Sequence, residues 1–383
     1  MILKTDCMYF PGDHPCIYNK QAGIKCDNCN YYKTASFRIL IIKLDAVGDV
    51  LRTTSILPAV KRKYPDSHIT WLTKRESAQL FLNNPFVDNL LFLQDDSLTA
   101  RLITETFDLM IHPDASPVSS SLAAIVKAKQ KSGFTLNSSG KVEVLNSEAE
   151  EWFEMGAFDE YKKKNKKTYQ QIIHEIAGLE YRKDEIILNL TEEEKKYARL
   201  FYEKNNLDKY RILIGINTGS GSRWPLKQWP VEKYMEFIEA IKADKNVGIL
   251  LFGGPDEEEK NRKIKLKYPE VIDSGSHNSL REFFALLNLS DAVITGDTMA
   301  LHAAVALKKN VICLFGPTSS AEIEDYGRIR KVVPEMECLV CYKNSCDFIP
   351  NCMDVITTGM VMNELKLIYP DLMVQGSRFK LQG

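Results

Sequence analysis

Short apolar runs alternate with amphipathic segments along most of the chain. Residues 38–43 (RILIIK) form a nearly continuous apolar run, which is typical of a strand buried on both faces. The residues from Val50 to Lys61 then follow a helical period. Further strands are predicted at 68–72, 90–93 and 109–112, and another helix at 78–82. This alternation predicts a doubly wound α/β domain.

The alternation restarts after a more polar middle section. Strands are predicted at 211–216, 247–252, 292–295 and 311–315, and helices at 231–243, 280–289 and 301–307. We expect the connection between the two halves to lie between 185 and 210. Two α/β domains leave a cleft between the carboxyl edges of their sheets, where ligands of open α/β folds bind.

The first 36 residues differ from the rest of the chain, because turn residues dominate and no apolar period is visible. We expect a cysteine-rich, metal-stapled extension at 1–36, an N-terminal Rossmann-like domain at 37–200 and a C-terminal one at 201–360. A cysteine insertion falls at 338–352, and a C-terminal helix or tail at 361–383.

Composition narrows the class of protein. The 383 residues include 50 Lys and Arg against 51 Asp and Glu, a net charge of −1, which argues against a dedicated nucleic-acid binder. Hydrophobic residues make up 44%, enough for a sizeable core. We find neither an apolar run of about 18 residues nor the apolar stretch of a signal peptide. We therefore expect a cytoplasmic protein, and leave open peripheral contact with the cytoplasmic face of the inner membrane.

Eight of the nine cysteines fall into two sets, each with a C-x2-C pair, and these sets predict structural metal sites. Zinc is the first expectation and iron the alternative, since both accept four thiolates. Free cysteines or a disulfide are the remaining alternatives, and His14 is a substitute ligand. Cys313 lies in an apolar strand and is expected in the core. The predicted metal ligands are Cys7, Cys16, Cys26 and Cys29 in one set, and Cys338, Cys341, Cys346 and Cys352 in the other.

The junction after the first strand is the first candidate for chemistry. Gly48 precedes Asp49 there, and the helix that follows favours anions at its N-terminus. The Asp49 carboxylate is placed to act as a general base on an acceptor hydroxyl, although it also suits a helix cap. A G-x-G-x-x-G fingerprint is missing, so a nicotinamide dehydrogenase is not expected.

Two junctions of the second half are candidates for binding a phosphorylated donor. Small residues in 217–222 free backbone N–H groups for phosphate, with Arg223 and Lys227 beside them. The alternative is a flexible surface loop. At the other junction, Asp297 and Thr298 suit sugar hydroxyls or phosphate, or a helix cap, and His302 is either a ligand contact or a core histidine. The predicted donor-binding residues are Thr218, Gly219, Ser222, Arg223, Lys227, Gly253, Asp297, Thr298 and His302.

Four motifs in this order resemble glycosyltransferase family 9, the ADP-heptose:lipopolysaccharide heptosyltransferases. They are 48–54 (GDVLRTT), 221–225 (GSRWP), 297–302 (DTMALH) and 315–318 (FGPT), and the resemblance covers about 38–360. It implies a GT-B fold, in which two Rossmann-like domains face a cleft. It also implies inverting transfer of a heptose, or a related sugar, from an ADP-activated donor without a catalytic metal. Asp49 would be the base. Met299 stands where the family has glycine.

The resemblance implies an acceptor hydroxyl on lipopolysaccharide core or another surface glycan. Basic residues of the first domain would meet a phosphorylated acceptor, and 162–167 would attract anionic headgroups; a solvated surface is the alternative. Two alternatives to this function are a protein O-heptosyltransferase of the autotransporter type, whose relatives contain iron, and a GT-B scaffold without activity. The predicted acceptor-binding residues are Lys61, Arg62, Lys63, His112 and Asp114.

Overall fold

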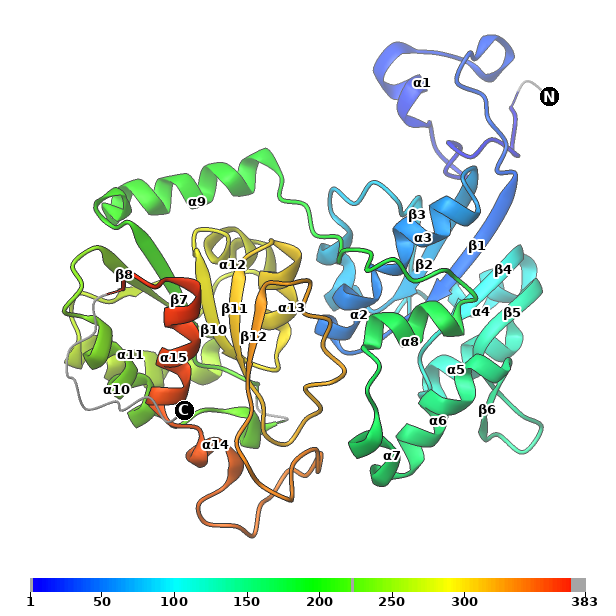
Figure 1. The fold of residues 1–383 in the computed structure, drawn as a ribbon. Coiled ribbons are helices and arrows are strands. Elements are labelled where there is room, and N and C mark those ends of the chain that lie inside the picture. The colour runs from blue at the N-terminus through cyan, green and yellow to red at the C-terminus, as the bar shows by residue number, and fades with distance from the viewer. Residues whose placement is uncertain (1–2, 222–223, 373–383) are drawn as a thin grey trace.

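The computed structural model describes residues 3–221 and 224–372, which form two α/β lobes and a small N-terminal extension (Figure 1). The extension carries the helix α1 (Ile17–Ala22) and projects from the first lobe, beside β1 and α3. The two lobes lie side by side, each around its own sheet. The predicted fold class, two Rossmann-like domains facing a cleft, is confirmed.

The first lobe contains a six-stranded sheet in the order β3-β2-β1-β4-β5-β6, parallel except for the β5–β6 pair. Its strands are β1 Phe37–Ile42, β2 Ser67–Thr73, β3 Asn89–Phe92, β4 Thr106–His112, β5 Lys127–Leu136 and β6 Val142–Val144. Its helices are α2 Val47–Thr53, α3 Ile56–Lys63, α4 Leu98–Thr104, α5 Pro117–Ile125, α6 Glu150–Ala157, α7 Asp159–Lys164 and α8 Tyr169–Ile176.

The second lobe contains a parallel six-stranded sheet in the order β12-β11-β10-β7-β8-β9. Its strands are β7 Ile212–Asn217, β8 Val247–Phe252, β9 Ile272–Asp273, β10 Ala292–Gly296, β11 Asn310–Leu314 and β12 Ile329–Val332. The helices of this half are α9 Glu192–Lys204, α10 Val231–Ile241, α11 Glu258–Lys267, α12 Leu280–Leu287, α13 Met299–Ala306, α14 Cys352–Val355 and α15 Thr358–Ile368. Residues 373–383 of the expected tail lie outside the described residues.

Both sheets have the same strand order when each is counted from its own first strand, and this order positions the site. In each sheet the first and fourth strands are neighbours, and the chain leaves them toward opposite sides. Such a switch point opens a crevice at the carboxyl ends of the strands. The crevices follow β1 and β4 in the first lobe, and β7 and β10 in the second. The predicted Asp49 and Asp297 junctions therefore lie at switch points.

The helical period predicted from Val50 to Lys61 is divided between two helices. α2 ends at Thr53 and α3 begins at Ile56. Pro58 explains the break, because it has no N–H for the carbonyl of Thr54 and its ring crowds that carbonyl. The predicted helix at 78–82 is instead a 3₁₀ segment, Arg75–Phe81.

A buried arginine joins parts of both halves of the chain. The Arg281 guanidinium on α12 donates to both oxygens of Glu194 on α9, at 2.6 Å each. It also donates to the carbonyl oxygens of Asn189 and Gln79, which belong to the crossing segment and the first lobe. In Figure 1, α9 runs along the upper side of the second lobe, next to α12.

We predict that Arg281→Ala lowers the free energy of unfolding by about 3 kcal/mol, because it leaves the Glu194 carboxylate buried without its partner. Urea denaturation of the full chain measures this change. The control is Arg262→Ala, which removes an exposed pair with Glu259 and is expected to change stability by less than about 0.5 kcal/mol. Equal effects of the two substitutions would contradict the prediction.

Candidate functional site

A cleft of about 730 Å³ lies between the two lobes at these switch points. One wall comes from the start of α2 in the first lobe. The other walls come from the loops after β7, β8 and β10 and from the segment after β11. The lining includes the predicted residues Asp49, Gly219, Lys227, Gly253, Asp297, Thr298 and His302.

Asp49 lies in the first turn of α2, with 35% of its side chain exposed. Its Oδ1 is 2.8 Å from an Nη of Arg52, and its Oδ2 accepts a hydrogen bond from the Ala46 N–H at 3.3 Å. Burial alone would raise the pKa of Asp49, but the positive charges of Arg52 and Lys43 hold it well below its ordinary range. The carboxylate is therefore ionised at neutral pH.

Arg52 is positioned by a helix distant in sequence. Its guanidinium lies 3.7 Å from the centre of the Tyr169 ring on α8, a cation–π contact. The Tyr169 hydroxyl is 2.7 Å from that of Thr53, and the Tyr169 N–H donates to the carbonyl of Glu322 at 2.9 Å. Tyr169 thus contacts Arg52 and links the first lobe to the second.

A lysine and an aspartate form the centre of the second-lobe wall. Lys227 Nζ donates to Asp297 Oδ2 at 3.0 Å and to the Asp297 carbonyl at 3.1 Å. Both side chains remain partly exposed, at 14% and 16%. Thr298 caps α13, since its hydroxyl accepts from the Ala300 N–H at 3.2 Å. The N-terminus of α13 is therefore directed toward the cleft beside a cation, an arrangement suited to an anionic ligand.

The two walls approach each other most closely at Gly48. A Cβ on Gly48 would lie 3.0 Å from His302 Cδ2 and 3.4 Å from Met299 Cα, so only glycine lets α2 and α13 meet without displacement. His302 is 7% exposed. Burial, and then the charge of Arg52, lower the pKa of His302 to about 4. The imidazole is therefore neutral at neutral pH.

Glu257 is a cleft residue that the sequence analysis missed. It is 4% exposed, and its Oε2 accepts from the Gly254 N–H at 2.9 Å. Its Oε1 has no hydrogen-bond partner in the described part of the chain. A Cβ on Gly219 would lie 2.6 Å from its carboxyl carbon, so that glycine makes room for the carboxylate. Its position just after the Gly-Gly-Pro turn of 253–255 was the available signal.

Glu322 and Tyr342 also line the cleft and were not predicted. The Tyr342 hydroxyl donates to Glu322 Oε1 at 2.8 Å and accepts from the Ser319 N–H at 3.2 Å. Burial raises the pKa of Glu322. Lys162 belongs to α7 of the first lobe, and its Nζ lies 5.1 Å from the centre of the Tyr342 ring of the second lobe. The insertion that carries the second cysteine set therefore reaches the cleft through Tyr342.

One of the described donor predictions, Thr218, is not among the residues that line the cleft. Thr218 is 1% exposed, and its hydroxyl donates to Asn261 Oδ1 at 2.6 Å behind the loop. This bond, rather than a ligand, satisfies the hydroxyl. Ser222 and Arg223 lie outside the described residues.

The predicted acceptor-side residues of α3 lie away from the lining of the cleft. Lys61, Arg62 and Lys63 at the end of α3 bind the carbonyl of Ser67, the carboxylate of Asp184 and the carbonyl of Gly178, respectively, and none of them lines the cleft. These partners come from segments whose proximity the sequence did not indicate.

His112 and Asp114 are also absent from the lining of the cleft. His112 is fully buried, and its Nδ1 is 2.7 Å from the carbonyl oxygen of Phe134, so its side chain faces the core. Asp114 lies 3.7 Å from the buried Lys43, behind the wall that carries Asp49.

The cysteine thiols are all free. Cys313 is buried in the core, as predicted. Within residues 3–221 and 224–372, no group of three or more His, Cys, Asp or Glu side chains is arranged to hold a metal ion. Over the same residues, no helix is both long and apolar enough to cross a bilayer.

Comparison with known proteins agrees with this geometry. Two Rossmann-like lobes around a cleft define the GT-B fold. The sequence profile described as glycosyltransferase family 9 (heptosyltransferase) matches residues 96–350. The chain belongs to glycosyltransferase family 9 and is a glycosyltransferase.

Individual relatives are distant in sequence. Lipooligosaccharide heptosyltransferase 2 of Haemophilus influenzae is 24% identical over 307 residues, covering 73% of this chain and 84% of that protein. A family 9 glycosyl transferase from Veillonella parvula superposes with a TM-score of 0.69 at 20% identity, covering 87% and 97% of the two chains. The Escherichia coli ADP-heptose LPS heptosyltransferase II gives 0.61 at 19% identity, covering 86% and 98%. At these identities the structures establish the fold.

We predict that His302 makes stability depend on pH between about 6.5 and 4. In the unfolded chain the imidazole of His302 takes up a proton near pH 6.5, whereas in the folded protein it does so only near pH 4. Stability is therefore lost as the pH falls through this window, by up to about 1.4 kcal/mol per pH unit for one histidine. In His302→Asn the denaturation midpoint should fall less steeply with pH.

The matched control is His277→Asn, because the His277 side chain is 74% exposed. This variant should reproduce the slope of the wild type. The contributions of the other titrating groups to the slope cancel, because each variant is compared with the wild type at every pH. An unchanged slope in His302→Asn would show that His302 does not titrate as described.

Proposed function

We propose that this glycosyltransferase transfers a heptose from an ADP-activated donor to a hydroxyl of a lipopolysaccharide-core acceptor, with inversion at the anomeric carbon. One observation carries the proposal. An ionised carboxylate, Asp49, lines a cleft whose opposite wall has Lys227, Asp297 and the N-terminus of α13. The named relatives, lipooligosaccharide heptosyltransferase 2 and an ADP-heptose LPS heptosyltransferase, support this choice of substrates.

The second lobe would hold the donor. Lys227 and the N–H groups at the start of α13 meet the diphosphate, and Asp297 and Thr298 are proposed to contact the sugar or phosphate. The unpartnered Oε1 of Glu257 accepts a hydroxyl of the donor. Gly219 and Gly253 line the cleft, and their missing side chains make room for Glu257 beside the donor. Predicted roles for Ser222, Arg223 and His302 in donor binding remain part of the proposal.

Asp49 would act as the general base. Its carboxylate takes the proton of the acceptor hydroxyl while the hydroxyl oxygen attacks the anomeric carbon. The bond from that carbon to the β-phosphate oxygen breaks on the opposite face, and its electron pair leaves with ADP. Lys227 and the helix N-terminus stabilise the charge that develops on the phosphate. No catalytic metal is part of the proposal.

The low pKa of Asp49 makes it a weak base in the free enzyme, but the donor changes its surroundings. A diphosphate in the cleft brings negative charge close to Asp49 and to the Arg52 beside it. Like charge disfavours ionisation, so the pKa of Asp49 rises when the donor binds. The base would therefore become stronger in the complex that needs it.

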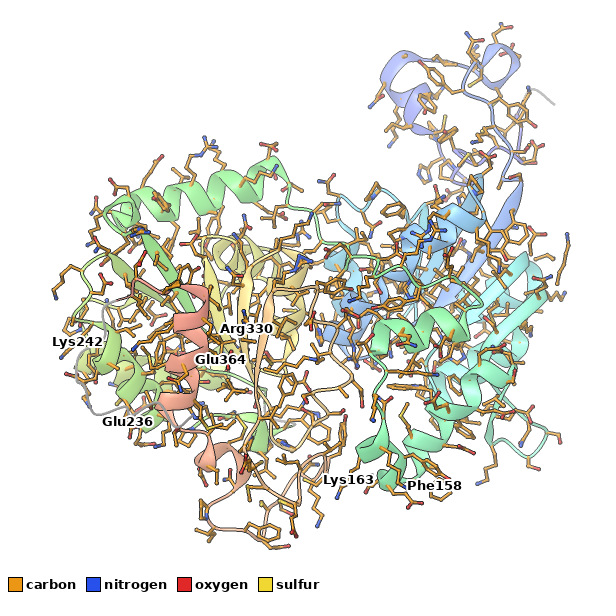
Figure 2. The ribbon with its side chains drawn as sticks, viewed as in Figure 1. Phe158, Lys163, Glu236, Lys242, Arg330 and Glu364 are labelled. Atoms are coloured by element: carbon orange, nitrogen blue, oxygen red, sulfur yellow. The ribbon has the colours of Figure 1, made fainter. Side chains whose placement is uncertain are left out.

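The acceptor and the membrane would be met at the lower end of the first lobe. Phe158 and Tyr161 are 55% and 42% exposed and are followed by the lysines of α7. Figure 2 shows Phe158 and Lys163 at this end. Apolar rings beside lysines suit a phosphorylated glycolipid at an anionic surface. We propose that the enzyme works at the cytoplasmic face of the inner membrane.

We also propose a structural metal, zinc or iron, at the second cysteine set. Burial, followed by the nearby thiols of Cys341, Cys338 and Cys346, raises the pKa of Cys352 to about 11. A bound cation would favour their thiolates and draw them together.

We predict that Asp49→Asn lowers kcat by about 10²- to 10⁴-fold, because the amide cannot accept the proton. Release of ADP from ADP-heptose in the presence of lipopolysaccharide-core acceptor measures turnover, and calorimetry should show donor binding within a few-fold of the wild type. Asp66→Asn, an exposed change outside the cleft, is the control and should retain activity. Wild-type turnover in Asp49→Asn would contradict the assignment. A wild-type enzyme that binds donor yet releases no ADP would contradict transfer itself.

We predict that Lys227→Met weakens ADP binding by about 10- to 100-fold, since it removes a charge-assisted contact to phosphate. Titration calorimetry with ADP measures the change, which should shrink at high salt. Lys233→Met removes an equally long lysine from an exposed pair with Glu236 and is the matched control. Equal ADP affinity in both variants would remove Lys227 from the phosphate site.

A further inference from the structure

The N-terminal extension encloses a hollow of about 520 Å³, and all four of its cysteines line it. Cys7 and Cys16 flank the Phe10–Pro15 turn region, while Cys26 and Cys29 belong to the 3₁₀ turn Cys26–Asn28 and the residue after it. The hollow lies in the part of the molecule that projects from the first lobe, far from the cleft (Figure 1).

The extension is ordered although it has no core. Of the described residues 3–36, none is buried. Tyr18 nevertheless stacks on Tyr31 with ring centres 4.0 Å apart, and Cys7 pairs with Thr34 as an isolated antiparallel bridge. A segment this small normally needs a disulfide or a metal group to fold.

The placement of the four thiols around the hollow indicates the kind of metal group that suits them. A single zinc ion draws four sulfurs to about 3.8 Å from one another, as tetrahedral bonds of about 2.3 Å require. The four thiols here surround a hollow, and they do not form a group that could hold one ion within the described residues. In a four-iron cluster each thiolate binds a different iron, so the sulfurs stand farther apart around a larger body.

The rest of the lining agrees with such an occupant. Apolar and aromatic groups, including Phe10, Pro15 and Ile24, make up much of the wall. Lys25 lines the same hollow and provides a positive charge near thiolates that would carry negative charge. We propose that Cys7, Cys16, Cys26 and Cys29 bind a [4Fe–4S] cluster that serves as the core of the extension.

The test uses the full chain, produced with added iron and purified without oxygen. We expect wild type to carry about four iron and four acid-labile sulfide ions more than Cys16→Ala or Cys29→Ala, along with the visible absorption of a cluster that both variants lose. Cys313→Ala is the control, because it removes a cysteine that lies outside both sets, and it should retain the wild-type content. Circular dichroism should show that the α/β lobes of all variants remain folded.

Three outcomes would overturn the proposal. The first is equal iron and sulfide in wild type and the Cys16 and Cys29 variants. The second is zinc without sulfide that is lost in those variants. The third is a wild type that shows no cluster either as purified or after reconstitution with ferrous iron and sulfide. None of these readouts depends on transfer activity, so the result is separate from the proposed function.

Discussion

The ion pair between Asp49 and Arg52 is the contact on which the rest of the site depends. Arg52 is only 11% exposed, and burying a guanidinium is costly unless opposite charge surrounds it. Asp49 supplies that charge from the same helix, and the charges of Glu322 and Asp297 reach it from the second lobe. The pair therefore keeps Asp49 ionised and favours the arrangement in which the two lobes face each other.

A steric constraint accompanies this electrostatic one. The missing side chain of Gly48 allows α13 to contact α2, and Met299 occupies the contact with both its backbone and its side chain. Met299 packs against the core while also lining the cleft. Met299, which stands where the family has glycine, therefore lies at the junction of the lobes, where its side chain contacts both walls of the cleft.

The sequence predicted the strands that are buried on both faces and the residues at their carboxyl ends, because both depend on local pattern. It did not predict β5, because the first half of this strand (KAKQK) is polar and shows no apolar run. Arg52, Glu322 and Tyr342 were missed because they reach the cleft from a helix turn or from distant loops. The sequence did not indicate the partners of Lys61, Arg62 and Lys63, because these lie more than 100 residues away or around a turn; their role toward the acceptor stays a prediction.

The two cysteine sets lie in structurally different positions. Near its junction with the body, the extension contacts the first lobe at Asp66, through Lys33 and Ser36, on the side away from the cleft. The second set lies on the loop that carries Tyr342, and Cys352 packs so closely on Gly316 that a Cβ there would be 2.5 Å from its sulfur. Cys341 directly precedes Tyr342, which donates to Glu322 in the cleft, whereas the hollow that the first set lines shares no residue with the cleft lining. The second set is therefore the one whose surroundings adjoin the cleft.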